Sequence, residues 1–289
     1  MNVLIAEPTG LCFGVSRAIR TMEETLERQG RVFCMGSPIH NPQEVRRLED
    51  KGLVVVDDDA QVPPGEAVFI RAHGVAPSVL SRLKEKETRI IDGTCPFVRK
   101  AQQMAGRLSE EGYFPVVLGD ENHPEIKGIL GYVKGPSLVV SGKKDLDTVE
   151  KIGKIGIISQ TTQQESTLKA LVAHAVGLAK EVRVFNTICR ATVERQNAVR
   201  SLAGFVDGIV VIGGHNSANT GKLFRIAQES ATPAVWVEQA DQLDRRWLAG
   251  KATVGIAAGA STPDWLIEQL QQAMEDNHRW TSGGCQKNE

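Results

Sequence analysis

Three of the five cysteines share one sequence context. Cys12, Cys95 and Cys189 each follow a strand-like apolar run and precede a segment with helical periodicity, at similar separations along the chain. A helix N-terminus carries partial positive charge, which lowers the pKa of a cysteine there and favours the thiolate. Three thiolates at one point repel each other unless a cation holds them, and Zn²⁺ and iron–sulfur clusters prefer thiolate ligands. We therefore predict a three-thiolate metal site with one coordination position open for a ligand.

The other two cysteines lack this context. Cys34 lies within the apolar run Val32–Met35, and Cys285 lies in a polar C-terminal tail. A single cysteine is most often a small buried apolar residue, so we interpret neither as a ligand. The odd number of cysteines, and an N-terminus without a basic and apolar leader, argue against a disulfide framework. We expect a cytoplasmic protein with reduced thiols.

A second group of polar residues has the chemistry of an anion site. It contains His40, His73, His123, Ser217, Asn219 and Ser261, each just past a predicted strand and before a predicted helix. Ligands bind at this place in open α/β sheets, and helix N-termini bind anions. Arg71 is the only basic residue other than histidine in these clusters, and neutral donors with histidines suit a small dianion or trianion such as a diphosphate.

Each of these residues also has a simpler structural interpretation. Ser217, Asn219 and Ser261 are suitable helix N-caps, and His73 before Gly74 suits a turn. The chain has no Gly-x-x-x-x-Gly-Lys-Ser/Thr loop and no Gly-x-Gly-x-x-Gly motif after its first strand. The sequence therefore gives no indication of nucleotide binding.

The elements that position these residues alternate between strands and helices. Twelve segments have the composition of short strands: Val3–Ala6, Val32–Cys34, Leu53–Val56, Ala67–Arg71, Arg89–Ile91, Phe114–Leu118, Leu138–Val140, Ile155–Ser159, Arg183–Phe185, Gly208–Ile212, Ala234–Val237 and Thr253–Ala257. Helical periodicity lies between many of them, and Pro42, Pro77, Pro124 and Pro263 suit the first turn of a helix. This alternation predicts an α/β fold with largely parallel sheets.

Length and charge limit the class of protein. The 289 residues include 41% hydrophobic and 24% charged residues, with a net charge of −1, as expected of a globular protein of about two domains. The near-neutral charge argues against nucleic acid or an anionic membrane as a partner. No apolar run reaches the length of about 18 residues that a transmembrane helix requires.

The recurring cysteine context predicts three pseudo-symmetric α/β lobes. We place the first at residues 1–95 with Cys12, the second at 96–188 with Cys95 at its start, and the third at 189–280 with Cys189 at its start. We expect residues 281–289 to form a flexible tail.

An ordered set of motifs resembles the 4-hydroxy-3-methylbut-2-enyl diphosphate reductase family. The matching segments run from residue 10 to residue 264: Gly10–Val15, Ile39–Asn41, Ala72–Val75, Asp92–Pro96, His123–Glu125, Ser159–Thr162, Cys189 to Thr192 with Arg195 and Gln196, Asn216 to Asn219, and Gly259 to Asp264. Each motif alone is weak. Their order over nearly the whole chain makes the resemblance specific.

The resemblance implies a trefoil of three lobes around one central [4Fe–4S] cluster. Cys12, Cys95 and Cys189 match the three cluster ligands, and the fourth iron is left open. The positions that hold the substrate diphosphate match His40, His73, His123, Thr161, Ser217, Ala218, Asn219 and Ser261. Glu125 matches the carboxylate that delivers a proton, and Thr161 matches the hydroxyl that assists it. Ala218 departs from the family, which often has serine there, so we expect its backbone N–H to replace that contact.

The implied reaction is a reductive dehydroxylation. The family removes the hydroxyl of 4-hydroxy-3-methylbut-2-enyl diphosphate to give isopentenyl and dimethylallyl diphosphate, with a ferredoxin or a flavodoxin as electron donor. Two alternatives remain open on sequence grounds. A zinc hydrolase would also use cysteine ligands, although no His-Glu-x-x-His motif is present. A non-catalytic anion-binding protein would use the same polar clusters and leave the cysteines without a role.

Overall fold

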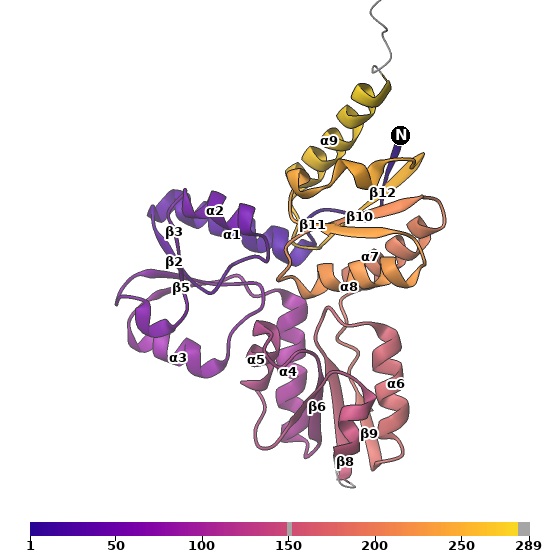
Figure 1. Cartoon of the computed structure of the whole chain (residues 1–289). Helices are drawn as coiled ribbons and strands as arrows, with labels where there is room; N and C mark the ends of the chain where they lie inside the picture. The colour runs from indigo at the N-terminus through magenta and orange to yellow at the C-terminus, as the bar shows by residue number, and fades with distance from the viewer. Residues whose placement is uncertain (149–151, 283–289) are drawn as a thin grey trace, which may run out of the picture. The chain divides into compact units, whose positions relative to one another are not determined.

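Three four-stranded parallel sheets organise the chain. The computed structural model describes residues 1–148 and 152–282 (Figure 1), so the predicted tail from 283 onward, with Cys285, lies outside the described residues. The sheet orders are β1-β12-β10-β11 (sheet A), β3-β2-β4-β5 (sheet B) and β7-β6-β8-β9 (sheet C), and the pairs in each are parallel. The predicted α/β fold with three lobes is confirmed.

Every predicted strand is present, with small differences at the ends. The strands are β1 Asn2–Ile5, β2 Val32–Met35, β3 Leu53–Val56, β4 Ala67–Ile70, β5 Arg89–Asp92, β6 Phe114–Leu118, β7 Leu138–Val140, β8 Ile152–Ser159, β9 Ala179–Val184, β10 Gly208–Ile212, β11 Ala234–Val237 and β12 Thr253–Ala258. Strands β8 and β9 begin earlier than predicted because their ladder continues through polar residues. Lys154 pairs with Glu181 there, and their side chains lie 3.4 Å apart.

Helices follow most strands. They are α1 Phe13–Gln29, α2 Pro42–Glu49, α3 Pro77–Glu85, α4 Pro96–Glu110, α5 Pro124–Leu130, α6 Glu165–Ala175, α7 Arg190–Ala203, α8 Ala218–Glu229 and α9 Asp264–Ser282. Proline occupies the first position of α2, α3, α4 and α5, where its fixed φ fits and its missing N–H is not needed. Pro263 lies one residue before α9 rather than inside it.

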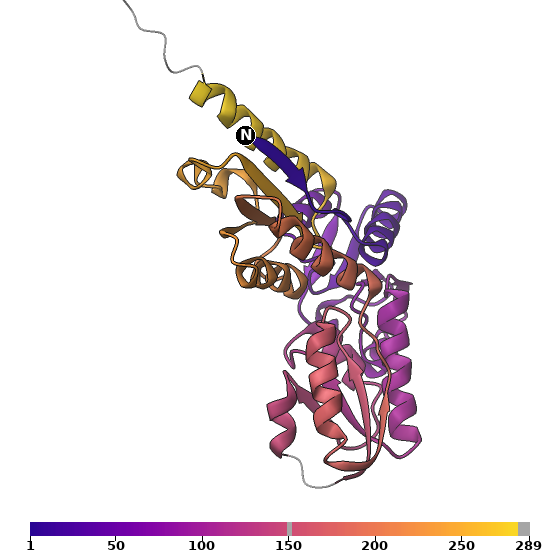
Figure 2. The ribbon, with the colours of Figure 1, turned by 90° about the vertical axis from the view of Figure 1, so that its right-hand side faces the viewer.

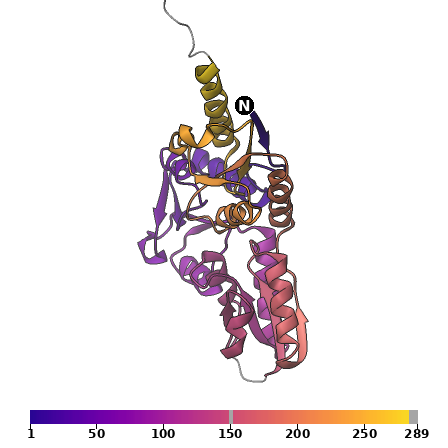
Figure 3. The same ribbon diagram turned by 45° about the vertical axis from the view of Figure 1, so that its right-hand side comes forward.

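The helices cover both faces of sheets A and C with apolar side chains. On sheet C, Val116 and Ile157 pack with α6, whereas Val117 and Ile158 pack with α4 and α5 (Figure 2). On sheet A, the residues facing one way pack with α9 (Figure 3), and those facing the other way pack with α7 and α8. Alternate residues of a strand point to opposite faces, so strands buried on both sides read as continuous apolar runs.

The division of the chain differs from the predicted lobes in one respect. Strand β1 pairs with β12 in sheet A, although it lies within the segment 1–95 that otherwise contains sheet B. The fold has two compact units. The first unit comprises Met1–Cys12, His40–Glu44 and Ala191–Glu289 and contains sheet A; the second comprises Phe13–Ile39 and Val45–Arg190 and contains sheets B and C. Apolar β1 covers an otherwise open edge of sheet A, which local sequence cannot indicate.

Candidate functional site

The three cysteines occupy equivalent places in the three sheets. Cys12 follows β1, Cys95 follows β5 and Cys189 follows β9, each an edge strand, and in all three cases a helix begins at the residue directly after the cysteine. Each cysteine N–H donates to a carbonyl oxygen just beyond the neighbouring strand. The acceptors are Ala260 at 3.0 Å, Ala72 at 3.0 Å and Thr161 at 2.9 Å, respectively. Each acceptor is the second residue after the end of its strand.

The polar candidates fall on the next two strands of the same sheets. The loops after the second strands carry Ser261 (β12), His73 (β4) and Thr161 (β8). The loops after the third strands carry the Ser217–Asn219 segment (β10), His40 (β2) and His123 (β6). Parallel strands end at one edge, so each sheet gathers one cysteine and two polar groups at its carboxyl end. The pseudo-repeat inferred from the cysteines thus extends to the polar residues.

The thiols fall into two classes by burial. Cys12, Cys95 and Cys189 are partly exposed, whereas Cys34 is fully buried in β2. Burial raises the pKa of the Cys34 thiol to about 12, so it stays protonated at neutral pH. This environment is that of an apolar core residue and not that of a metal ligand.

Space at Cys95 depends on a glycine of the neighbouring helix. A Cβ at Gly14 in α1 would lie 2.5 Å from the Cys95 sulfur, closer than real side chains approach. Arg17, one turn further along α1, donates to the carbonyl oxygen of Thr94 at 3.3 Å. The start of α1 is therefore fixed against the Cys95 loop, and Gly14 keeps the thiol clear of a side chain.

Glu125 and Thr161 form a buried pair beside Cys189. Glu125 is 2% exposed, and its two carboxylate oxygens accept from the Thr161 N–H at 2.6 Å and the Thr161 hydroxyl at 2.9 Å. The Thr161 carbonyl oxygen accepts from the Cys189 N–H. The His123 ring caps α5 by accepting from the Glu125 N–H at 3.2 Å. These contacts fix a carboxyl group at the carboxyl edge of sheet C.

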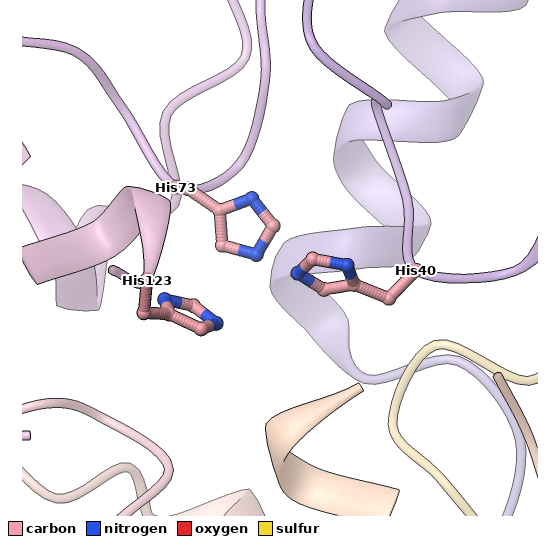
Figure 4. A group of neighbouring side chains, drawn as sticks. All are labelled: His40, His73 and His123. Atoms are coloured by element: carbon pink, nitrogen blue, oxygen red, sulfur yellow. The ribbon is translucent and has the colours of Figure 1, made fainter. Parts of the chain in front are cut away.

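His73 and His123 lie together in the second unit. Their ring centroids are 5.3 Å apart with the planes at 84° (Figure 4). The loop of His73 passes so close to α4 that a Cβ at Gly74 would lie 2.5 Å from the Gln102 amide nitrogen. This packing brings a histidine of sheet B beside one of sheet C. His40, also drawn in Figure 4, belongs to the first unit.

The first unit presents hydroxyl and amide groups at the edge of sheet A. Ser217 caps α8 by accepting from the Thr220 N–H at 3.2 Å, and the Ser261 hydroxyl donates to the His40 carbonyl oxygen at 3.3 Å. Asn219 is 5% exposed, and within the described part of the chain neither its amide oxygen nor its amide nitrogen has a hydrogen-bond partner. Buried amides normally have partners, so Asn219 points to a polar ligand. Ala218 begins α8, where its N–H has no partner within the helix.

A buried arginine, Arg195, supports the Cys12 loop, a role that the sequence did not indicate. Arg195 in α7 is 4% exposed and donates to the carbonyl oxygens of Gly10 at 2.9 Å and Thr9 at 3.3 Å. Gly10 has a φ of +70°, and a Cβ there would contact the Asp264 carboxylate. The available signal was an arginine on the apolar face of a helix, which indicates that its charge meets a partner inside the protein.

A family model matches most of the sequence. The model is that of the LytB protein, and it covers residues 3–275. The chain belongs to the LytB family. The resemblance that the ordered motifs predicted is therefore confirmed.

LytB relatives match over nearly their entire length. The protein named 4-hydroxy-3-methylbut-2-enyl diphosphate reductase from Aquifex aeolicus is 42% identical over 280 residues, which cover 96% of each chain. A protein of the same name from a Geobacter species is 44% identical over 270 residues, covering 93% of this chain and 95% of that one.

Two solved structures share the fold. One is (E)-4-hydroxy-3-methyl-but-2-enyl diphosphate reductase, the terminal enzyme of the non-mevalonate pathway. It is 41% identical with a TM-score of 0.72, and the match covers 96% of this chain and all of the other. The second is the corresponding reductase from Plasmodium falciparum, 27% identical with a TM-score of 0.89, over 94% of this chain and 87% of the other.

Proposed function

We propose that this chain is a 4-hydroxy-3-methylbut-2-enyl diphosphate reductase that forms isopentenyl and dimethylallyl diphosphate. The reaction replaces an allylic hydroxyl by hydrogen: the substrate takes up two electrons and two protons, the C–O bond breaks and water leaves. The placement of Glu125 and Thr161 beside Cys189 carries this proposal, because it joins a buried proton donor to a candidate metal ligand. Membership of the LytB family supports the same reaction.

The donor set fits an iron–sulfur cluster. Cys12, Cys95 and Cys189 hold equivalent backbone positions and partly exposed thiols, and Gly14 leaves room at the Cys95 sulfur. We propose that these three cysteines hold one [4Fe–4S] cluster. When bound, the cluster supplies electrons singly and offers an open iron as a Lewis acid for the substrate hydroxyl.

Glu125 is the residue that we assign to proton delivery. Its carboxyl group is almost completely buried, and Thr161 fixes both of its oxygens. Hydroxide is a poor leaving group, so a carboxyl group positioned to supply a proton lowers the barrier to C–O cleavage. The Thr161 hydroxyl holds the carboxyl group in orientation and assists the transfer.

The remaining polar residues are the proposed diphosphate anchor. His40, His73, His123, Ser217, Asn219 and Ser261 supply side-chain donors, and Ala218 supplies its backbone N–H. The Asn219 amide has no hydrogen-bond partner among the residues that the structure describes, which supports this role. The diphosphate does not react, so these contacts orient the allyl group.

The electron donor that we propose is a ferredoxin or a flavodoxin, because both carriers deliver one electron at a time. None of the helices in residues 1–148 and 152–282 is long and apolar enough to cross a membrane. The cytoplasmic location and the absence of nucleic-acid partners stay predictions. The two alternatives, a zinc hydrolase and a non-catalytic anion-binding protein, find no support among relatives that match over almost the whole chain.

One experiment tests the proposal. The protein is purified without oxygen, and its visible spectrum and its iron and sulfide content are measured. Turnover of 4-hydroxy-3-methylbut-2-enyl diphosphate is then measured with a redox mediator that dithionite keeps reduced. We expect a broad shoulder near ~400 nm that bleaches on reduction, together with formation of both five-carbon diphosphates. A colourless protein after iron and sulfide reconstitution, or a coloured protein without turnover, would contradict the cofactor or the reaction, respectively.

A further inference from the structure

Sheet B carries a positive charge at a position that is neutral in the other two sheets. The residue directly after the second strand is Arg71 in sheet B, Gln160 in sheet C and Gly259 in sheet A. The Gln160 amide oxygen accepts from the Asp120 N–H at 3.2 Å, and its nitrogen donates to the Thr162 hydroxyl at 3.0 Å. At Gly259 a side chain has no room, since a Cβ there would contact the Thr220 hydroxyl.

The Arg71 guanidinium crosses to the end of the third strand. There a Cβ at Gly36 would lie 2.5 Å from its Nη1 atom, so the glycine, with a φ of +67°, leaves the space that the guanidinium occupies. Nη1 donates to the Ser37 carbonyl oxygen at 3.4 Å, which is long for such a bond. The Nε atom is buried and has no hydrogen-bond partner among the residues that the structure describes.

No anion in the described parts of the chain compensates this charge. Arg71 forms no ion pair with a carboxylate there, and the nearby Cys34 thiol is protonated at neutral pH because burial raises its pKa to about 12. Burial lowers the pKa of Arg71, although an arginine stays charged at neutral pH. A partly buried cation without a counterion costs free energy, and an incoming anion removes that cost.

We propose that Arg71 is an anion-binding residue and that the anion is the diphosphate group of the substrate. Arg71 lies two residues before His73, at the edge where sheet B gathers its polar groups. It supplies a permanent positive charge, which hydroxyls and amides lack. This inference rests on the proposed function, and it adds an arginine to the histidine, hydroxyl and amide donors of the proposed diphosphate anchor.

The variant Arg71→Gln isolates the charge. Glutamine is the residue that sheet C has at the equivalent position. There Gln160 accepts a hydrogen bond from the Asp120 N–H and so supports the neighbouring loop. Arg71→Lys keeps the charge without the guanidinium geometry. Arg89→Gln is the matched control, because Arg89 is exposed at the opposite end of the same sheet, at the start of β5.

The measurements use cluster-loaded protein purified without oxygen. They are the Kd of inorganic diphosphate by calorimetry at two salt concentrations, the KM and kcat of the allylic substrate, the iron content and the unliganded Tm. For Arg71→Gln we expect Kd and KM to rise about ten- to a hundredfold, as for loss of a charge-assisted hydrogen bond. We expect kcat, iron content and Tm to stay near the parent values. Arg71→Lys should remain within about fivefold of the parent, and Arg89→Gln should match it.

The outcomes separate the inference from the proposed function. If Arg71→Gln lowers Tm but leaves the Kd of diphosphate and its salt dependence unchanged, Arg71 only supports the Ser37 loop and the inference is overturned. The same conclusion follows if the parent protein turns the substrate over yet Arg71→Gln has the parent KM. If the parent binds diphosphate through Arg71 but does not reduce the substrate, the proposed reaction fails while the anion site stands.

Discussion

At the scale of single residues, the buried carboxyl group of Glu125 is held through both of its oxygens. Both oxygens are occupied by Thr161, whose carbonyl oxygen also receives the Cys189 N–H. A shift of Thr161 would therefore move the proton donor and the cysteine loop together. Glu125 lies in α5 and Thr161 follows β8, so this contact brings residues of two different elements together.

Substitution of Glu125 by glutamine should separate proton delivery from binding. Glu125→Gln keeps the size of the side chain. We expect kcat to fall about a hundredfold or more, because the glutamine amide is not acidic enough to act as a proton donor. The iron content and the KM should stay close to the parent. The control is Thr161→Ser, which retains the hydroxyl and should lose much less activity. Turnover of Glu125→Gln near the parent rate would show that the proton takes another route.

At the scale of elements, the strand pattern and the helix starts were predictable from the sequence. Buried parallel strands read as short runs of valine, isoleucine and leucine, as in β10, and proline marks the first residue of α5. The starts of β8 and β9 were not predictable from the sequence, because the pairing of these two strands continues through polar residues such as Lys154. The candidate cysteines and histidines were identified by their position after strands. The roles of Gly14 and Arg195 were not predictable, because they depend on contacts between distant elements.

The close approach of α1 to the Cys95 loop leads to a test at this scale. Gly14→Ala should lower the iron content of anaerobically reconstituted protein to less than about half, because the new methyl group meets the Cys95 sulfur. Without metal, the unfolding free energy should not fall much, since alanine is a better helix former than glycine by up to about 1 kcal/mol. Ser16→Ala, exposed on the same helix, is the control. Full iron incorporation in Gly14→Ala would mean that the thiol has space to spare.

An ion pair between the buried Asp59 and the half-exposed Arg82 ties the short helix η1 (Asp59–Gln61) to α3 and should make stability depend on pH. Asp59 is 5% exposed, and Arg82 donates to both of its oxygens, the shortest contact being 2.6 Å. These hydrogen bonds lower the pKa of the Asp59 carboxyl group in the folded protein. The stabilisation is therefore present above the unfolded pKa of about 3.9 and is lost as pH falls through the lower folded value.

Asp59→Asn should consequently destabilise the protein at neutral pH by about 1–2 kcal/mol. The difference from the parent should shrink as the pH falls below 4, because the parent carboxyl group then becomes protonated. Urea unfolding between pH 7 and pH 3 measures this. Asp57→Asn, which removes a neighbouring exposed carboxylate, should show no such dependence. A difference that stays constant over the whole range would exclude ionisation of Asp59 as its source.

At the scale of the whole molecule, the repeated unit is one sheet with a cysteine at its edge strand and polar groups on the next two strands. The sequence indicated this repeat through the cysteines, but it could not place β1, because the partner of an edge strand is set by long-range pairing and not by local pattern. Sheet A is completed by the two ends of the chain, β1 and β12. The predicted first lobe, residues 1–95, therefore contains one strand of sheet A, β1, together with the four strands of sheet B.

The three equivalent cysteines should contribute equally to cluster binding, although Cys12 belongs to the first unit and the other two to the second. Cys12→Ser, Cys95→Ser and Cys189→Ser should each lose most of the bound iron and essentially all turnover, since a cluster with two protein thiolates is poorly held. Iron analysis and the absorbance near ~400 nm measure the loss. Cys34→Ala is the matched control: its thiol is buried and protonated, so the variant should lose some stability but keep its iron. Should Cys12→Ser retain a full complement of iron, the cluster would be a site of the second unit alone, and the equivalence of the three sheets would not extend to their chemistry.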